Sequence, residues 1–218
     1  MASENKGIEV RKAAWQILRR FEKPGTARLK ADNLIHEVLQ SSGDSWTDQD
    51  RGFLTTLVYG VLRQWVLLDG LMADQLSCPI KKVEPKVRTL IRLGLFQLKC
   101  LDHIPDYAAI DGVVALAKKT GCSQKTVGFI NGVLRGYQRN SASEDTTQPE
   151  IKIDSITQLA AQKSLPGWVA SLLVNTYGLE ASAEMADVIN QPATLSLRVN
   201  QRRTSVEDYC KALDTAGV

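Results

Sequence analysis

Apolar residues recur three or four positions apart through the first 140 positions, which is the spacing of amphipathic helices. The first stripe runs from Val10 to Phe21 and ends at the KPGT sequence of residues 23–26. Similar stripes predict further helices over about residues 31–39, 47–76, 85–98, 107–120 and 123–137. Thr47, Pro85 and Ser123 stand where such helices would begin, and the Thr47 hydroxyl is expected to accept the amide of Asp50. The pattern predicts an all-α domain.

A polar stretch then separates two parts of the chain. Residues 141–150, SASEDTTQPE, hold one apolar residue and are interpreted as a linker. Helical spacing resumes over about 156–160, 168–177 and 181–189, and a last helix is predicted over about 205–216. We therefore divide the chain into a helical domain at 1–140, a linker at 141–150 and a smaller module at 151–218.

One segment of the second module changes its period. Leu195, Leu197 and Val199 alternate with polar residues, which predicts a half-buried β-strand. A single strand cannot bury its apolar face or pair its backbone groups alone. The module is therefore expected to be an incomplete α+β unit, which either continues in a longer polypeptide or self-associates through the strand near Leu197.

Composition restricts the class of protein. The chain has 218 residues, of which 44% are hydrophobic and 23% charged, close to globular averages. No apolar run reaches the roughly 20 residues that span a bilayer, and no secretory signal is recognisable, so no membrane partner is expected. Its four cysteines form no CxxC pair and it has two histidines, which favours neither a zinc site nor a disulfide framework. A cytoplasmic location is predicted.

Charge is distributed unevenly. Residues 1–140 hold 21 Lys and Arg against 14 Asp and Glu, whereas residues 141–218 hold 6 against 10. A basic first part suggests an anionic partner such as RNA. The candidate RNA-binding residues lie in three basic clusters: Arg11, Lys12, Arg19 and Arg20; Lys81 and Lys82; Lys118 and Lys119. A solvated helix face is the alternative interpretation of each cluster, and Trp15 is expected to pack at the edge of the core.

Several motifs resemble a known family. VRTLIRLGLFQL (87–98), IPDYAAIDGVVALAKKTG (104–121) and FINGVLR (129–135) resemble the NusB family of all-helical RNA-binding and antitermination proteins. Residues 165–217 resemble the segment that follows the NusB-like domain in the Sun/Fmu family of ribosomal RNA cytosine-5 methyltransferases, also called RsmB. The resemblance implies an RNA-binding N-terminal region that binds and positions 16S ribosomal RNA for a covalently linked methyltransferase domain.

The chemistry of that family is not recognisable in these residues. Its catalytic half carries a glycine-rich loop for S-adenosylmethionine and cysteines in Pro-Cys and Thr-Cys motifs. Here the cysteines follow Ser77, Lys99, Gly121 and Tyr209, and no such loop occurs. We therefore predict no catalytic residue, cofactor site or metal site in this chain, and the resemblance implies S-adenosylmethionine only for the full-length enzyme.

Two other functions remain open. In the first alternative, the chain is a stand-alone NusB-like antitermination factor that binds RNA and a protein partner. In the second, it is a helical scaffold that binds only protein. Residues 165–217 favour the methyltransferase interpretation, because a free NusB-like factor has no use for this extension.

Gly132 of the FINGVLR motif predicts a close backbone approach, since glycine inside a helix costs about 1 kcal/mol relative to alanine.

Overall fold

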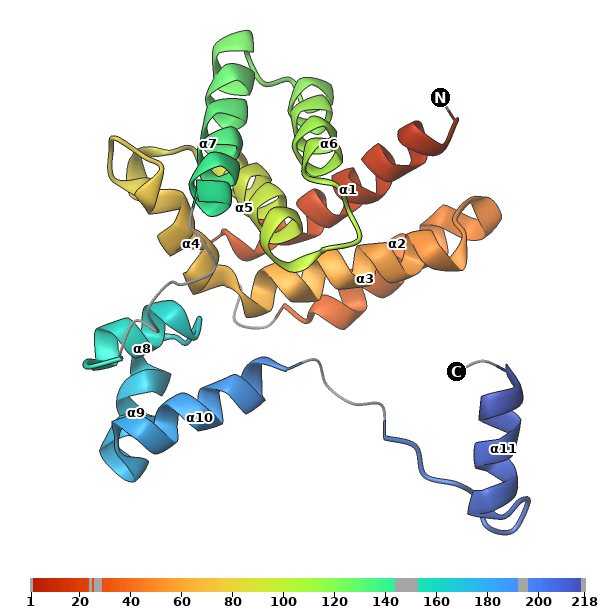
Figure 1. Ribbon diagram of the computed structural model, residues 1–218. Coiled ribbons are helices and arrows are strands. Elements are labelled where there is room, and N and C mark those ends of the chain that lie inside the picture. The colour runs from red at the N-terminus through yellow and green to blue at the C-terminus, as the bar shows by residue number, and fades with distance from the viewer. Residues whose placement is uncertain (1, 24, 26–28, 144–152, 192–195, 217–218) are drawn as a thin grey trace. The chain divides into compact units, whose positions relative to one another are not determined.

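The computed structural model describes residues 2–23, 25, 29–143, 153–191 and 196–216. These residues form eleven α-helices, two short 3-10 helices and no β-strand (Figure 1). None of the described helices is long and apolar enough to cross a membrane. The helices are α1 (Ala2–Phe21), α2 (Ala31–Ser42), α3 (Asp48–Arg63), α4 (Trp65–Asp74), α5 (Pro85–Cys100), α6 (Asp106–Lys119), α7 (Gln124–Ser143), α8 (Ile156–Gln162), α9 (Gly167–Tyr177), α10 (Leu179–Asn190) and α11 (Val206–Ala216).

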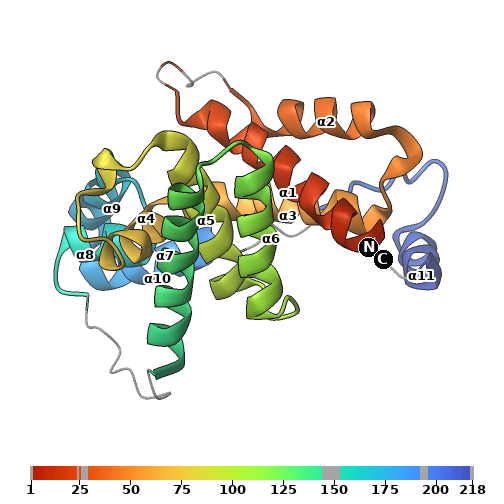
Figure 2. The ribbon, with the colours of Figure 1, turned by 90° about the horizontal axis from the view of Figure 1, so that it is seen from above.

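Helix α5 is the centre of the first seven helices. Every residue from 89 to 97 is buried, because α1, α3, α4, α6 and α7 all pack against this helix. Figure 2 shows α1 crossing the bundle between α2 on one side and α5 and α6 on the other. The predicted all-α class is confirmed, and the core is a single cluster to which all seven of these helices contribute.

The expected helix starts are present, but one predicted helix is divided. Thr47 Oγ1 accepts the Asp50 amide at 3.2 Å, and Asp50 accepts the Thr47 amide in return. The stripe predicted over 47–76 breaks at Gln64, whose φ of −95° and ψ of 14° leave the helical region. Helix α4 therefore begins again at Trp65, in a new direction (Figure 1).

The helices α8 to α10 have a small core of their own around Leu159 and Ala170. They join the larger bundle at α4, where Ser164 Oγ accepts the amides of Val66 and Leu67 at 3.1 and 3.3 Å. The hydroxyl thus caps the start of α4 in place of Gln64, whose side chain makes no capping bond. Residues 1–188 consequently form one compact unit.

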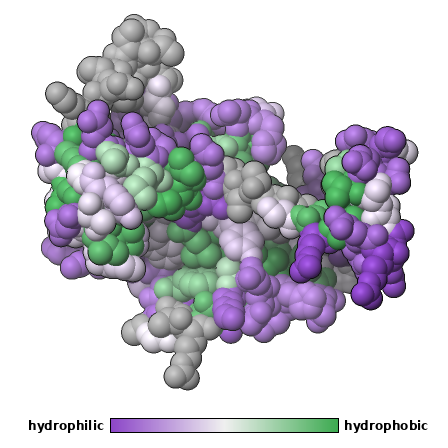
Figure 3. Space-filling model, turned by 90° about the horizontal axis from the view of Figure 1, so that it is seen from below, coloured by the Kyte–Doolittle hydropathy of each residue, from purple (hydrophilic) through white to green (hydrophobic). Residues whose placement is uncertain are grey.

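Helix α9 carries apolar side chains on both its buried and its exposed side. Trp168 is 72% exposed and Leu172 is 58% exposed, whereas Val169 and Leu173 pack into the small core. An apolar surface therefore remains on α9 and continues on α10 with Val188, and Figure 3 shows hydrophobic side chains reaching the surface on this side. Periodicity alone does not distinguish such a two-sided apolar helix from a buried one.

Residues 189–218 form a second compact unit. Its described part contains α11 and, before it, residues 196–200, which form no strand; Leu195 lies outside the described residues. The prediction of one β-strand is therefore not met among the described residues of this unit. A strand needs a neighbour to take its backbone hydrogen bonds, and the described residues supply none.

Candidate nucleic-acid interface

Helix α1 buries its apolar side in the bundle and turns a basic side outward. Ile17 and Leu18 are buried in the main core. Residues three or four positions apart lie on the same side of a helix with 3.6 residues per turn. The side opposite the buried one therefore carries Lys12, Gln16 and Arg19. Gln16 and Arg19 are exposed and the Lys12 side chain is 40% exposed. We call Lys12, Gln16 and Arg19 the α1 stripe.

A hydrogen bond joins the beginning of α5 to α1 near the C-terminal end of the α1 stripe. The Arg19 guanidinium lies over the Trp15 ring, 4.8 Å from its centroid. Trp15 is 7% exposed, as predicted for the core edge, and its Nε1–H donates to the Lys86 carbonyl at 3.1 Å. This bond fixes the beginning of α5 against α1. Lys81 and Lys82, both exposed, lie in the short 3-10 helix just before it.

One lysine cluster adjoins the N-terminal end of the stripe. Lys119 Nζ, at the end of α6, donates to Glu9 at 2.7 Å, and Lys12 Nζ lies 3.9 Å from the same carboxylate. The hydrogen bond from Lys119 lowers the pKa of Glu9, so Glu9 is ionised at neutral pH and partly offsets the two lysines. Lys118 beside them is exposed.

Two of the predicted residues lie away from this surface. Arg11 is 8% exposed and its Nε donates to Gln97 Oε1 at 2.8 Å, inside the bundle. Arg20 is exposed but turns toward α2, where it pairs with Glu37 at 3.5 Å. Lys12 and Arg19 therefore lie on the outer side of α1, Lys119 pairs with Glu9 of the same helix, and Arg11 faces the interior.

A buried ion cluster, which was not predicted, stabilises the C-terminal end of α1. Arg92 donates to both carboxylate oxygens of Asp69, at 2.6 and 2.9 Å, and also to Glu22 just after α1. Arg88 pairs with Glu22 at 2.8 Å, and the Arg92 guanidinium lies 3.9 Å from the centroid of the Trp65 ring. The sequence signal was an arginine pair four residues apart inside the apolar run of α5, where unpaired charge is costly.

Solved structures share the fold of the first part. A crystal structure of the antitermination factors NusB and NusE in complex with dsRNA is 24% identical, with a TM-score of 0.54, and covers 64% of this chain and 99% of the other. The solution structure of NusB from Aquifex aeolicus is 21% identical, with a TM-score of 0.52, and covers 68% and 99%. At this identity the likeness concerns the fold.

Relatives in sequence extend over most of the chain. The probable ribosomal RNA small subunit methyltransferase B of Bacillus subtilis is 34% identical over 186 residues, which is 85% of this chain and 40% of the relative. The protein of the same name from Synechocystis is 34% identical over 206 residues, 94% of this chain and 44% of the relative. The chain thus spans less than half the length of these relatives.

Two family matches divide the chain. Residues 165–218 match the "Methyltr_RsmF/B-like, ferredoxin-like domain" family. Residues 8–139 match the NusB family, and this match contains the whole α1 stripe and both lysine clusters. With the helical architecture and the solved NusB structures in agreement, the chain belongs to the NusB family.

Proposed function

We propose that the NusB-like part of this chain binds RNA along the α1 stripe, with the lysine clusters extending the contact at both ends. The observation that carries the proposal is a pair of contacts. The Glu9–Lys119 ion pair joins the end of α6 to α1. The Trp15–Lys86 hydrogen bond joins to α1 the beginning of α5, which follows Lys81 and Lys82 in the chain. Lysine and arginine in such a row suit the regularly spaced phosphates of an RNA backbone.

The substrate is proposed to be small-subunit ribosomal RNA. Support comes from the names of the relatives, which are ribosomal RNA small subunit methyltransferases, and from a NusB neighbour solved with dsRNA. Phosphate contacts position a protein on RNA without reading its sequence. The domain would therefore raise the local concentration of ribosomal RNA near a covalently linked methyltransferase domain, in the cytoplasm.

We further propose a functional division at residues 1–140, 141–150 and 151–218. The two family matches, at 8–139 and 165–218, support this division. Packing follows a different boundary, because Ser164 attaches the α8–α9 segment to α4.

Methyl transfer is assigned to residues outside this chain. S-adenosylmethionine is bound in such folds at a glycine-rich turn between a parallel strand and a helix. The described residues form no strand, and Cys78, Cys100, Cys122 and Cys210 do not follow proline or threonine. These residues do not fit the cofactor, so we derive no catalytic step for them.

The second candidate is a stand-alone NusB-like antitermination factor. It shares the RNA surface but has no role for residues 165–218, which match a methyltransferase-associated domain. The attachment of this region to α4 through Ser164 and the relatives' names both favour the first proposal.

The test is RNA binding by fluorescence anisotropy across a salt series. The purified chain and its Lys12→Ala/Arg19→Ala variant are titrated into a labelled fragment of small-subunit ribosomal RNA. Removing two phosphate contacts should weaken binding and reduce the slope of log affinity against log salt by roughly 0.7–0.9 per contact.

A matched double variant controls for total charge. Lys99→Ala/Arg139→Ala also removes two exposed cations, but from α5 and α7 away from the stripe. Its slope should equal that of the unmodified chain. Equal losses of RNA affinity in both variants would mean that binding follows net charge alone and would overturn the α1 stripe as the binding surface. An absence of RNA binding by the unmodified chain would overturn the proposed function.

A further inference from the structure

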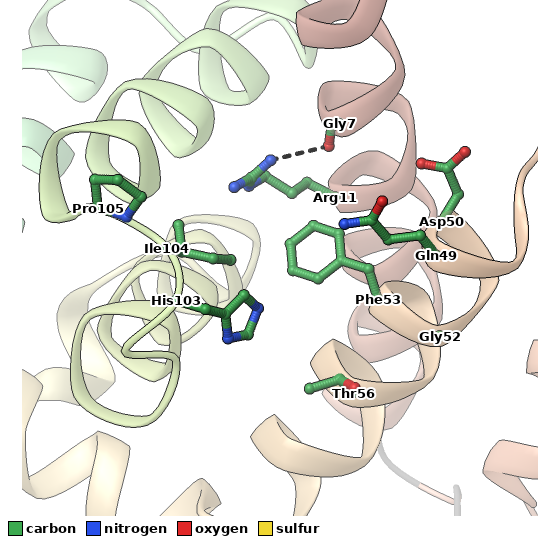
Figure 4. Close-up of a pocket in the computed structure, with 10 residues that line it drawn as sticks. All are labelled: Gly7, Arg11, Gln49, Asp50, Gly52, Phe53, Thr56, His103, Ile104 and Pro105. Carbon is green, nitrogen blue, oxygen red and sulfur yellow. Dashed lines mark hydrogen bonds between the residues drawn. The ribbon is translucent and has the colours of Figure 1, made fainter. Parts of the chain in front are cut away.

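A hollow of about 570 Å³ opens beside the buried residue Arg11. It lies between the first half of α1, the first turns of α3 and the loop that leads into α6 (Figure 4). Phe53, Ile104 and Pro105 give it an apolar side, and Gln49, Thr56 and His103 give it a polar side. The RNA-binding proposal does not involve this hollow.

Arg11 brings a positive charge to the hollow without a matching negative one. It is 8% exposed; Nε donates to Gln97 Oε1 at 2.8 Å and Nη1 donates to the Gly7 carbonyl at 3.1 Å. Both acceptors are neutral, and among the described residues no carboxylate pairs with Arg11. Burial lowers its pKa to about 10, so the guanidinium is still charged at neutral pH.

The position of the guanidinium is fixed by its neighbours. The Gln97 amide donates to the Leu93 carbonyl at 2.7 Å, which holds its oxygen toward Arg11. The Phe53 ring centroid lies 5.0 Å from the guanidinium carbon. At Gly112 on α6, a Cβ would stand 3.0 Å from that carbon, so glycine leaves the space that the guanidinium occupies. Arg11 is thus a preorganised cation that lines the hollow.

Helix dipoles add to the positive potential. Helix α3 begins at Asp48 and α6 begins at Asp106, and the first turn of α3 and the residues just before α6 both line the hollow. Helix N-termini favour anions. Asp50 also lines the hollow, but its carboxylate is bonded to Thr47 and points away from Arg11, whereas Gln49 and His103 point toward the space (Figure 4).

We propose that this hollow binds a single carboxylate carried on an apolar stem, with Arg11 as its counter-charge and Gln49 and His103 at its mouth. A guanidinium edge matches a carboxylate with two parallel hydrogen bonds. Phe53, Ile104 and Pro105 would contact the stem. The carboxylate would come from an acidic side chain of a peptide or from a free organic acid.

A phosphodiester is the less suitable anion for this site. Asp50 lines the hollow, and Asp48 and Asp106 are the first residues of the two helices whose starts adjoin it; these carboxylates would repel the successive phosphates of an RNA backbone. One carboxylate meets less of this repulsion and gains the buried cation. The α1 stripe, by contrast, is exposed and carries no aspartate, so the two surfaces select different anions.

The experiment is an NMR titration of the whole chain at constant ionic strength, balanced with chloride. The probes are sodium propionate, sodium dimethyl phosphate, and two capped tripeptides, Ala-Glu-Ala and Ala-Gln-Ala. The signals are the Arg11 Nε–H, the Gln49 side-chain amide and the Gly52 amide. Propionate and the glutamate peptide should shift all three signals to saturation, and the glutamine peptide should not. Tighter binding of the peptide than of propionate assigns the source to a protein, and the reverse assigns it to a free acid.

Two variants make the result decisive. Arg11→Gln should weaken propionate binding by about tenfold or more. If Arg11→Gln does not fold, the double variant Gln49→Ala/His103→Ala is decisive, because both of these side chains are exposed. The double variant should weaken propionate binding severalfold. The control variant Gln124→Ala on α7 should leave propionate binding unchanged. Any one of three outcomes would overturn the proposal. These are undiminished binding in the site variants, no saturable shift with either carboxylate probe, and tighter binding of dimethyl phosphate than of propionate. RNA affinity should be unchanged in Gln49→Ala/His103→Ala, which separates this site from the proposed function.

Discussion

The ring of Phe96 on α5 occupies the space that a side chain at Gly60 on α3 would need. A Cβ placed on Gly60 would stand 1.9 Å from Phe96 Cζ and 2.4 Å from Cε2. Both residues are buried, and Phe96 is 5% exposed. Helices α3 and α5 therefore approach as closely as they do because position 60 has no side chain.

We predict that Gly60→Ala destabilises the chain in spite of the better helix propensity of alanine. The propensity gain is about 1 kcal/mol. Overpacking a core costs about 1–3 kcal/mol, and contact with a rigid ring places this case at the upper end. The free energy of unfolding, measured by urea denaturation, should fall by about 2 kcal/mol.

Gly132→Ala on α7 is the matched control. Gly132 is exposed and nothing lies within 4 Å of its would-be Cβ, so the sequence-based interpretation of a close approach at this position is wrong. The substitution should raise the unfolding free energy by about 0.5–1 kcal/mol. A Gly60→Ala chain as stable as Gly132→Ala would show that α3 and α5 can separate at no cost.

The two glycines illustrate where sequence reasoning is informative and where it fails. Helix starts at Thr47 and Pro85 were predictable, because capping and the lack of a proline N–H act within one turn. Which glycine lies against a neighbouring helix depends on the rotation of one helix against another, and the pattern within one helix does not contain that information.

In the candidate interface, too, some features follow from the local sequence and others depend on contacts between helices. Lys12 and Arg19 of the predicted basic cluster do lie on the outer side of α1. Arg11 belongs to the same predicted cluster and lies only one position from Lys12, but it is buried and bonded to Gln97, 86 residues away. The contacts that bring Lys86 and Lys119 to α1 are equally long-range, so no local pattern could show which residues of α5 and α6 contact this helix.

A second prediction concerns the buried ion cluster. Arg92 has 3% of its side chain exposed and contacts two carboxylates, Glu22 and Asp69. Removing one partner of a buried ion pair costs about 3–5 kcal/mol because a charge is left without a partner. Arg92→Met should cost about 3 kcal/mol, at the lower end, since Arg88 still neutralises Glu22. Urea denaturation measures the change.

Arg20→Met serves as the comparison for that variant. Arg20 also pairs with a glutamate, Glu37, but both side chains are exposed, at 47% and 67%. Exposed ion pairs contribute at most about 1 kcal/mol. If the two variants lose the same free energy, burial does not determine the strength of the Arg92 cluster.

The third prediction is a pH dependence at the start of α3. Hydrogen bonds from the backbone N–H of Thr47, and then from its hydroxyl, lower the pKa of Asp50 below its ordinary value. Because the folded pKa is below the unfolded one, the stabilisation is present above pH about 4 and is lost as pH falls through the folded pKa. Thr47→Ala removes the hydroxyl, so the pKa of Asp50 should rise part of the way toward its ordinary value.

Stability and titration measure this change separately. At neutral pH, Thr47→Ala should lower the free energy of unfolding by about 1 kcal/mol, the usual cost of losing a helix cap. The difference between the two proteins should shrink as pH falls through the lowered pKa of Asp50 in the folded chain, where its carboxylate becomes protonated. An NMR titration of the Asp50 carboxyl carbon gives the pKa directly, and an unchanged pKa in Thr47→Ala would rule out the hydroxyl as a cause.

The last prediction concerns residues 196–200, where the sequence pattern and the structure differ. Leu197 is 52% exposed, Val206 is 48% exposed, and α11 has no buried residue. Covering the apolar side chains of this segment would contribute several kcal/mol at roughly 25 cal/mol per Å², but only against a sheet that the described residues do not form. We therefore expect the amides of Leu197 and Val199 to exchange with solvent rapidly in a monomeric sample, while those of the buried residues Leu57 and Val133 exchange slowly. Raising the protein concentration should slow the first pair only if a second copy supplies the missing strand. Equal protection of all four amides in a monomer would mean that the segment already has its partner, contrary to our interpretation of it as one strand of an incomplete unit.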